Sequence, residues 1–126
     1  MKPKVLSPLE HEIMDIVWEL GQCSVKEVLE RINQNKQLAY TTIATILQRL
    51  YEKCLVTRKG QGVAYFYSPK LSKKSYSKNL AQSFLNKFFS SYGDVAITSF
   101  AESIEKLPKK KKEYLLELLK NHDENK

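Results

Sequence analysis

Short polar side chains with hydrogen-bonding groups recur between residues 41 and 49, near the middle of the chain. Thr41, Thr45 and Gln48 are three or four residues apart, a spacing that places them on one face of a helix. Hydroxyl, amide and guanidinium groups suit the base edges and phosphates of a DNA major groove. Surface helices more often carry Glu and Lys at such positions. The candidate DNA-contacting residues of this segment are Tyr40, Thr41, Thr42, Thr45, Gln48, Arg49 and Lys53.

An apolar stripe on the opposite face indicates how this segment would be held. The stripe consists of Ile43, Ile46, Leu47 and Leu50. It predicts a helix over residues 40–53 that buries one face and leaves the polar face outside. Two helices are expected before it, because Ser7-Pro8-Leu9-Glu10 and Ser24-Val25-Lys26-Glu27 both match a capping box. The first should stop at Gly21 and the second near Asn33.

A β-hairpin is predicted directly after the polar-faced helix. Residues 55–59 and 63–68 are runs of β-branched and aromatic residues, joined by Gly60-Gln61-Gly62 and closed by Pro69. Three helices followed by a hairpin are typical of the winged helix-turn-helix, in which the third helix reads DNA and the hairpin, or wing, touches the backbone. We expect this domain over residues 1–70. The candidate DNA contacts of the wing are Arg58, Lys59 and Gln61.

Residues 71–126 predict three more helices, over 72–92, 95–104 and 110–121. Four of the five Phe residues of the chain lie between positions 84 and 100. Three short helices can scarcely bury so much apolar area alone, so we expect a mainly α dimerisation domain that forms a homodimer. The alternative is a monomer in which these helices fold back on the first domain. The candidate dimer-interface residues are Leu80, Phe84, Leu85, Phe88, Phe89, Phe100, Ile104, Leu115, Leu118 and Leu119.

The charge of the chain is unevenly distributed. Lys and Arg number 21 against 14 Asp and Glu, and residues 36–90 hold ten bases with the single acid Glu52. A field of one sign over such a long segment attracts a polyanion such as double-stranded DNA, although a solvated lysine-rich face has the same composition. The lysine run at 109–112 is open to the same two interpretations, a solvated face or an additional phosphate contact.

Few residues could support other chemistry. The 126 residues suffice for one domain or two small parts. His11 has acidic neighbours in the sequence and His122 lies in a polar tail, and neither is near a nucleophile or a set of metal ligands. We therefore expect no enzyme, no metal site and no cofactor. Cys23 and Cys54 predict neither a zinc site nor a disulfide, and we expect both to be buried. No apolar stretch is long enough to insert into a membrane, which favours a cytoplasmic protein.

Three stretches of the sequence together carry a resemblance to a known family. They are Leu6-Ser7-Pro8-Leu9-Glu10 with Ile13-Met14 and Val17-Trp18, then Ala39-Tyr40-Thr41-Thr42-Ile43-Ala44-Thr45-Ile46-Leu47 with Arg49-Leu50 and Glu52-Lys53, and finally Gly62 with Tyr65-Phe66-Tyr67-Ser68-Pro69. These residues resemble the penicillinase-repressor family, of the BlaI, MecI and CopY type. The match is strong over residues 6–69, and over 72–119 it rests on the helical pattern.

The resemblance implies a homodimeric winged-helix repressor that binds a palindromic operator. In the antibiotic-resistance members of the family, a membrane zinc metalloprotease sensor causes the repressor to be cut, which relieves repression. Such a sensor is therefore an expected partner. The family is cut at an Asn-Phe bond, and the corresponding bond here is Ser99-Phe100.

Two further departures from the family pattern affect the interpretation. The copper-responsive branch carries a C-terminal cysteine cluster, and no Cys follows Cys54 here, which argues against copper sensing. Cys54 also replaces the Gly that usually ends the third helix, so that this residue is either strained or in a different turn. The rival function is a winged-helix module that binds protein rather than DNA. Such a module would need an apolar outer face on the third helix. The polar residues Thr41, Thr45 and Gln48 argue against this function.

Overall fold

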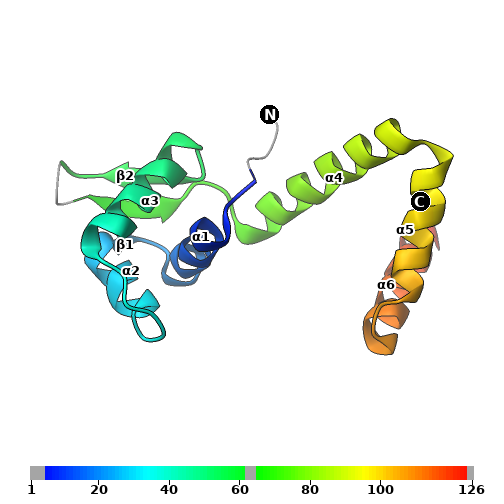
Figure 1. Cartoon of the computed structure of the whole chain (residues 1–126), viewed down its shortest axis with the longest axis horizontal. Helices are drawn as coiled ribbons and strands as arrows, with labels where there is room; N and C mark the ends of the chain where they lie inside the picture. Colours follow the sequence, from blue (N-terminus) through cyan, green and yellow to red (C-terminus); the bar gives the residue numbers. More distant parts are fainter. Residues whose placement is uncertain (1–4, 62–64, 125–126) are drawn as a thin grey trace. The chain divides into compact units, whose positions relative to one another are not determined.

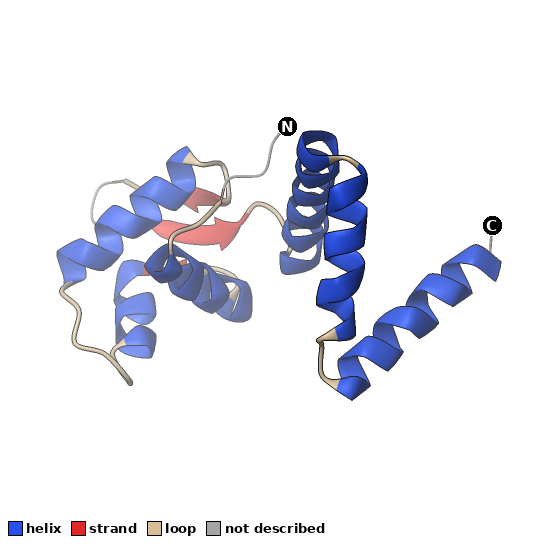
Figure 2. Cartoon of the chain, turned by 45° about the vertical axis from the view of Figure 1, so that its right-hand side comes forward, coloured by secondary structure: helices blue, strands red, loops and turns tan. Residues whose placement is uncertain are grey.

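The computed structural model describes residues 5–61 and 65–124, which form six helices and three strands (Figures 1 and 2). The elements are α1 (Pro8–Leu20), β1 (Cys23–Ser24), α2 (Val25–Ile32), α3 (Tyr40–Glu52), β2 (Val56–Lys59), β3 (Phe66–Pro69), α4 (Lys73–Tyr92), α5 (Asp94–Glu105) and α6 (Lys109–Glu124). The chain divides into two compact units, Met1–Ser83 and Phe84–Lys126. The division falls within α4, further along the chain than the expected boundary near residue 70.

The first two helices begin at the predicted capping boxes. The Ser7 hydroxyl accepts from the Glu10 amide at 3.2 Å, and the Glu10 carboxylate accepts from the Ser7 amide at 2.8 Å. The same reciprocal pair joins Ser24 and Glu27 at the start of α2. Gly21 ends α1 with a φ of 77°, which glycine adopts without the penalty that a β-carbon would bring. The expected start and stop of these helices are confirmed.

The sheet is antiparallel with the strand order β1-β3-β2. The predicted hairpin is confirmed, with Arg58 of β2 opposite Tyr67 of β3. The sequence-based prediction missed β1, whose two residues pair with β3 and are too few to show an alternating pattern. The second strand was expected to begin at residue 63, but β3 begins at Phe66, and residues 62–64 lie outside the described part of the chain.

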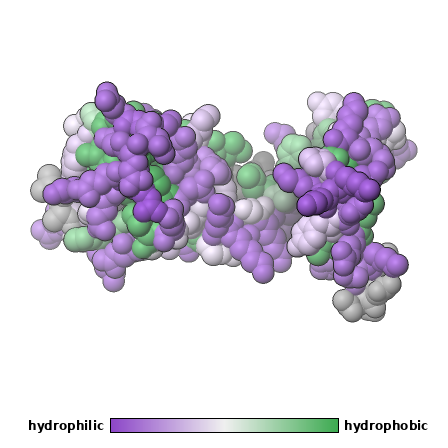
Figure 3. Space-filling view, turned by 90° about the horizontal axis from the view of Figure 1, so that it is seen from below, coloured by the Kyte–Doolittle hydropathy of each residue, from purple (hydrophilic) through white to green (hydrophobic). Residues whose placement is uncertain are grey.

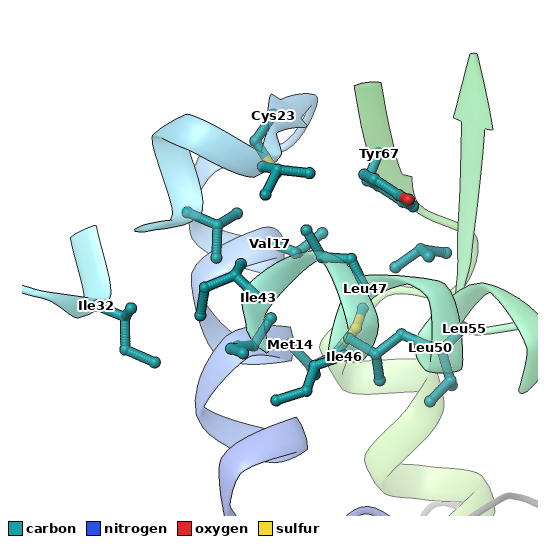
Figure 4. Close-up of a cluster of buried hydrophobic side chains, with 14 of the residues drawn as sticks. Met14, Val17, Cys23, Ile32, Ile43, Ile46, Leu47, Leu50, Leu55 and Tyr67 are labelled. Atoms are coloured by element: carbon teal, nitrogen blue, oxygen red, sulfur yellow. The ribbon is translucent and has the colours of Figure 1, made fainter. Parts of the chain in front are cut away.

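The core of the first unit lies where α1, α2 and α3 meet the sheet. Figure 4 shows Met14 and Val17 of α1 facing Ile43 and Leu47 of α3, with Tyr67 of β3 at one side. All are fully or almost fully buried. The predicted apolar stripe of α3 is confirmed, since each of its four members is buried. This packing leaves the other face of α3 toward solvent.

The first turns of α4 belong to this core. The Trp18 indole donates to the Leu71 carbonyl at 2.9 Å, and its ring lies 5.8 Å from that of Tyr76. Tyr76 is buried, and Leu80 packs against the same cluster. Leu80 therefore differs from the other residues expected at a dimer interface, because the described structure already gives it a place in the first unit.

Cys54 follows α3 in a left-handed conformation, with a φ of 64°. The Cys54 amide donates to the Tyr51 carbonyl and the Leu55 amide to the Leu50 carbonyl, both at 3.0 Å. These bonds form a Schellman motif, so the turn usual for glycine is kept with a cysteine in it. The thiol is exposed, which shows that the expectation of a buried Cys54 was wrong. Cys23 is buried as expected, and its burial raises its pKa to about 11, with a smaller contribution from Glu27.

The second unit consists of the end of α4 together with α5 and α6. The Phe89 ring of α4 meets the Phe100 ring of α5 at 5.9 Å, and Phe88 lies between Phe84 and Tyr92 at 5.8 and 5.6 Å. Among the residues whose burial is described in this unit, Ala96 alone is buried. Figure 3 shows apolar side chains reaching the surface among the hydrophilic ones. No helix in the described ranges is long and apolar enough to cross a membrane.

Candidate nucleic-acid interface

The polar row predicted from the sequence lies on the outer face of α3. Thr41, Thr45 and Arg49 are exposed, and Thr42 and Gln48 are partly so. Together with Leu9 of α1 and Ile46 at its base, the threonines and Arg49 line a shallow depression in the surface. A depression with apolar atoms at its floor and hydroxyl and guanidinium groups around it suits the edge of a base, such as the methyl group of thymine, beside a phosphate.

The turn before α3 is held by one side chain. The side-chain nitrogen of Asn33 donates to the Leu38 backbone carbonyl at 2.9 Å, and its side-chain oxygen accepts from the Leu38 backbone N–H at the same distance. Asn33 follows the last turn of α2, so this double hydrogen bond sets the direction in which the chain enters α3. The turn therefore holds α3 in one orientation relative to α2, with the polar face of α3 exposed.

Arg58 of the wing is bound to α3. Its guanidinium carbon lies 4.0 Å from the centre of the Tyr51 ring and 4.2 Å from that of Tyr65, an arrangement in which both rings attract the cation. Its Nη1 donates to the Gln48 side-chain oxygen. Burial opposes the charge of Arg58, but a hydrogen bond with Tyr67 and the neighbouring tyrosines outweigh it and raise the pKa.

The structure gives Lys53 an intramolecular partner. Its Nζ lies 2.9 Å from both carboxylate oxygens of Glu10, at the start of α1. Glu10 is only 5% exposed. Hydrogen bonds from the Ser7 amide and from Lys53 hold the pKa of Glu10 below its ordinary value, against the opposing effect of burial. Lys53 neutralises this buried carboxylate while its side chain stays 30% exposed. The DNA contact expected of Lys53 stays a prediction.

The remaining candidates lie on the surface. Lys59 and Gln61 are exposed beside the loop of the wing, and Tyr40 is exposed at the first turn of α3. His11 pairs with Asp15 at 3.2 Å on the surface of α1. Within the described ranges, no group of three or more His, Cys, Asp or Glu side chains could hold a metal ion.

Sequence reasoning missed four residues that shape this surface. Tyr51 and Tyr65 enclose Arg58, Glu52 accepts from the Gln48 amide at 3.0 Å, and Leu9 lines the depression. The spacing of Gln48 and Glu52, four residues apart, could have indicated their contact. The other contacts join residues from different elements, for which the local pattern holds no signal.

A helix-turn-helix with a β-wing and a polar, exposed third helix defines the winged-helix class of DNA-binding folds. The chain itself belongs to the penicillinase repressor family, whose model matches residues 6–121. The resemblance seen in the sequence is thereby confirmed, and so is the mainly α fold with a small wing.

Individual relatives agree with this assignment. The chain is 30% identical to a penicillinase repressor of Staphylococcus aureus over 114 residues, which cover 90% of each protein. It is 25% identical to a penicillinase repressor of Bacillus licheniformis over 121 residues, covering 96% of this chain and 94% of the relative. The solution structure of the DNA-binding domain of the repressor BlaI matches with a TM-score of 0.51 and 25% identity, covering 60% of this chain and 92% of that domain.

Proposed function

We propose that the chain represses transcription as a homodimer that reads a palindromic operator with α3 of each subunit. That it is a DNA-binding transcriptional repressor follows from its family and its fold. The observation that carries the finer proposal is the exposed row of Thr41, Thr45 and Arg49 on α3, in an element that other winged helices place in the major groove. Its place of action is then the cytoplasm, where bacterial DNA lies.

Two kinds of DNA contact are assigned to this surface. Thr41, Thr42, Thr45 and Gln48 contact base edges, since their hydrogen-bonding groups are short and lie on one face of α3. Arg49, Lys53, Lys59, Tyr40 and Gln61 contact the backbone and position the protein. The segment 36–90, with ten bases and one acid, provides the field that attracts the duplex.

The second unit supports the homodimer. Its aromatic and aliphatic side chains stay exposed within one chain, for example Phe84 at 60% and Leu119 at 55%. A patch of this kind on a small unit is typical of an interface with a second copy. The proposed interface comprises Phe84, Leu85, Phe88, Phe89, Phe100, Ile104, Leu115, Leu118 and Leu119. A dimer places two copies of α3 on one DNA duplex, which makes binding of the second half-site intramolecular.

Release of the operator is proposed to follow a cut at the Ser99-Phe100 bond, triggered by a membrane metalloprotease sensor. Both residues are exposed in the middle of α5. The Ser99 carbonyl accepts from the Ser103 hydroxyl at 3.0 Å. Proteases bind extended substrate, so α5 must open locally before the bond is cut. The cut would remove α6 and part of α5 from the interface and leave the winged helix folded.

Footprinting of the full chain on the DNA upstream of its own gene tests the proposed reading of an operator. We expect protection of two half-sites related by a two-fold axis, with centres one or more turns of the double helix apart. Gln48→Ala and Thr45→Ala should change which bases are preferred, at a cost of about 1 to 3 kcal/mol for each lost base contact. Lys59→Ala should weaken binding to all duplexes equally. Uniform protection along the DNA would contradict the proposal.

Intact-mass analysis after exposure of cells to a cell-wall antibiotic tests the proposed cut. We expect two fragments that separate after Ser99, and a faster cut in Ser99→Asn, which restores the Asn-Phe bond of the family. An unbroken chain in fully derepressed cells would show that another signal acts on the dimer.

A further inference from the structure

We infer that Arg58 is a positioning residue, which fixes the side-chain amide of Gln48 in one orientation for reading a base and does not itself bind a phosphate. The inference deepens the proposed function and rests on it. It changes the role that the sequence suggests for Arg58, since a basic residue beside a wing tip is expected to touch the DNA backbone.

The contacts of Gln48 determine which way its amide faces. On one side its oxygen accepts from Arg58 Nη1, and on the other its Nε2 donates to Glu52 Oε1 at 3.0 Å. An arginine can only donate and an ionised carboxylate can only accept. Rotating the amide by 180° would set donor against donor and acceptor against acceptor. The amide therefore has one favoured orientation, with its oxygen toward the wing and its nitrogen toward the end of α3.

Arg58 is itself held in place. Its guanidinium carbon lies 4.0 Å from the centre of the Tyr51 ring of α3 and 4.2 Å from the centre of the Tyr65 ring beside β3. Leaving this position to reach a phosphate would give up two cation–π contacts and the hydrogen bonds to Gln48 and Tyr67. Lys59, the next residue of β2, is exposed and suits phosphate contact better.

The fixed amide selects a base. After its bonds to Arg58 and Glu52, Gln48 retains one lone pair on oxygen and one N–H on nitrogen. Adenine presents a matching pair in the major groove, the N6 donor and the N7 acceptor. An amide that offers one acceptor and one donor matches adenine and not guanine, whose major-groove edge has two acceptors. Fixing its orientation removes the reversed arrangement, in which its oxygen and nitrogen would each face the wrong group of adenine. Gln48 is therefore expected to prefer adenine at one position of each half-site.

The test is selection of duplexes from a randomised pool by the full chain, followed by binding measurements over a range of salt concentrations. Arg58→Lys keeps the charge but loses the planar group between the two rings. We expect it to reduce the preference for adenine at one symmetric position about tenfold, with other positions and the salt dependence unchanged. In the Gln48→Ala background, Arg58→Lys should have no further effect on base preference. Lys59→Ala is the matched control, and it should lower the salt dependence while leaving base preference intact.

Two results would overturn the inference. One is an unchanged base preference in Arg58→Lys together with an equal loss of affinity for all duplexes in Arg58→Ala. The other is an effect of Arg58→Lys that persists at full size in the Gln48→Ala background. A wild-type chain that selects no sequence at all would instead overturn the proposed reading of an operator, and with it the inference. Thermal unfolding of each variant identifies any loss of affinity that comes from misfolding.

Discussion

Lys53 at the end of α3 and Glu10 at the start of α1 form an ion pair in which Nζ lies 2.9 Å from both carboxylate oxygens. Glu10 also closes the capping box of α1 with Ser7. One carboxylate thus caps the first helix and fixes the end of the third helix against it. The pair therefore helps to set the position of the polar face that α3 presents.

Replacing Glu10 by Gln should destabilise the first unit. The amide keeps an acceptor for the Ser7 amide but leaves Lys53 without its counter-charge. Because Glu10 is buried and Lys53 is partly exposed, we expect a loss of about 1 to 3 kcal/mol in the free energy of unfolding, measured with urea. Glu12→Gln is the matched control, since Glu12 pairs with Lys36 at 2.8 Å on the surface. It should cost less than about 1 kcal/mol. Equal losses in the two variants would contradict the importance of the buried pair.

The stability of the wild-type chain should depend on pH through Glu10. Its pKa is lower in the folded chain than the ordinary value of about 4.3, so the folded state favours the ionised form. The stabilisation is therefore fully present above the unfolded pKa and is lost as the pH falls through the folded pKa. Urea unfolding of wild type and Glu10→Gln from pH 7 to 3 should show their difference shrinking below about pH 4.3. A difference that stayed constant would mean that ionisation of Glu10 is not the cause.

Local signals in the sequence predict most of the helices, whereas the site depends on contacts between distant residues. The capping boxes at Ser7 and Ser24 and the stop at Gly21 are complete within a few residues, so α1 and α2 match their prediction closely. The pairing of Lys53 with Glu10 and the enclosure of Arg58 join different elements, which a periodic pattern cannot show. Residues predicted for the outer face of α3 are indeed outside, but their partners became visible only in the folded chain.

The boundary between the two compact units also depends on contacts that a local sequence pattern does not show. Apolar residues recur every four positions along α4 in the sequence, at Tyr76, Leu80, Phe84 and Phe88. In the structure Tyr76 and Leu80 pack into the core of the first unit, while Phe84 begins the second. A stripe on a helix predicts that a face is covered, but it does not say which partner covers each turn.

Cys54→Gly should stabilise the chain. Cys54 adopts a φ of 64°, where a β-carbon costs about 1 to 2 kcal/mol. Glycine loses more backbone entropy on folding, which offsets about 0.4 to 1 kcal/mol of this gain. We expect a net gain of about 0.5 to 1 kcal/mol, seen as a higher midpoint of thermal unfolding. Cys54→Ala keeps the β-carbon and serves as the control without a thiol. A gain of equal size in Cys54→Ala would assign the effect to the thiol rather than to the backbone.

Phe84→Asp should separate the dimer. The aspartate would place a charge in the proposed apolar interface, at a cost of several kcal/mol. Sedimentation of the variant should show monomers at concentrations where the wild-type chain is a dimer. Val5→Asp is the control, because Val5 is also an exposed apolar residue but lies in the first unit. It should leave the dimer intact. A stable dimer formed by residues 1–83 alone would place the interface elsewhere.

The central claim is that the basic segment around α3 and the wing binds duplex DNA sequence-specifically. The salt dependence of DNA binding tests this claim most directly. The measurement is the affinity of the full chain for its selected operator and for a scrambled duplex, at salt concentrations between 50 and 200 mM. If a dimer neutralises about 6 to 8 phosphates, log K for the operator should fall against log salt with a slope of about −5 to −7. The operator should bind at least about 10³-fold more tightly than the scrambled duplex. A slope near zero, or equal affinities for the two duplexes, would contradict the claim.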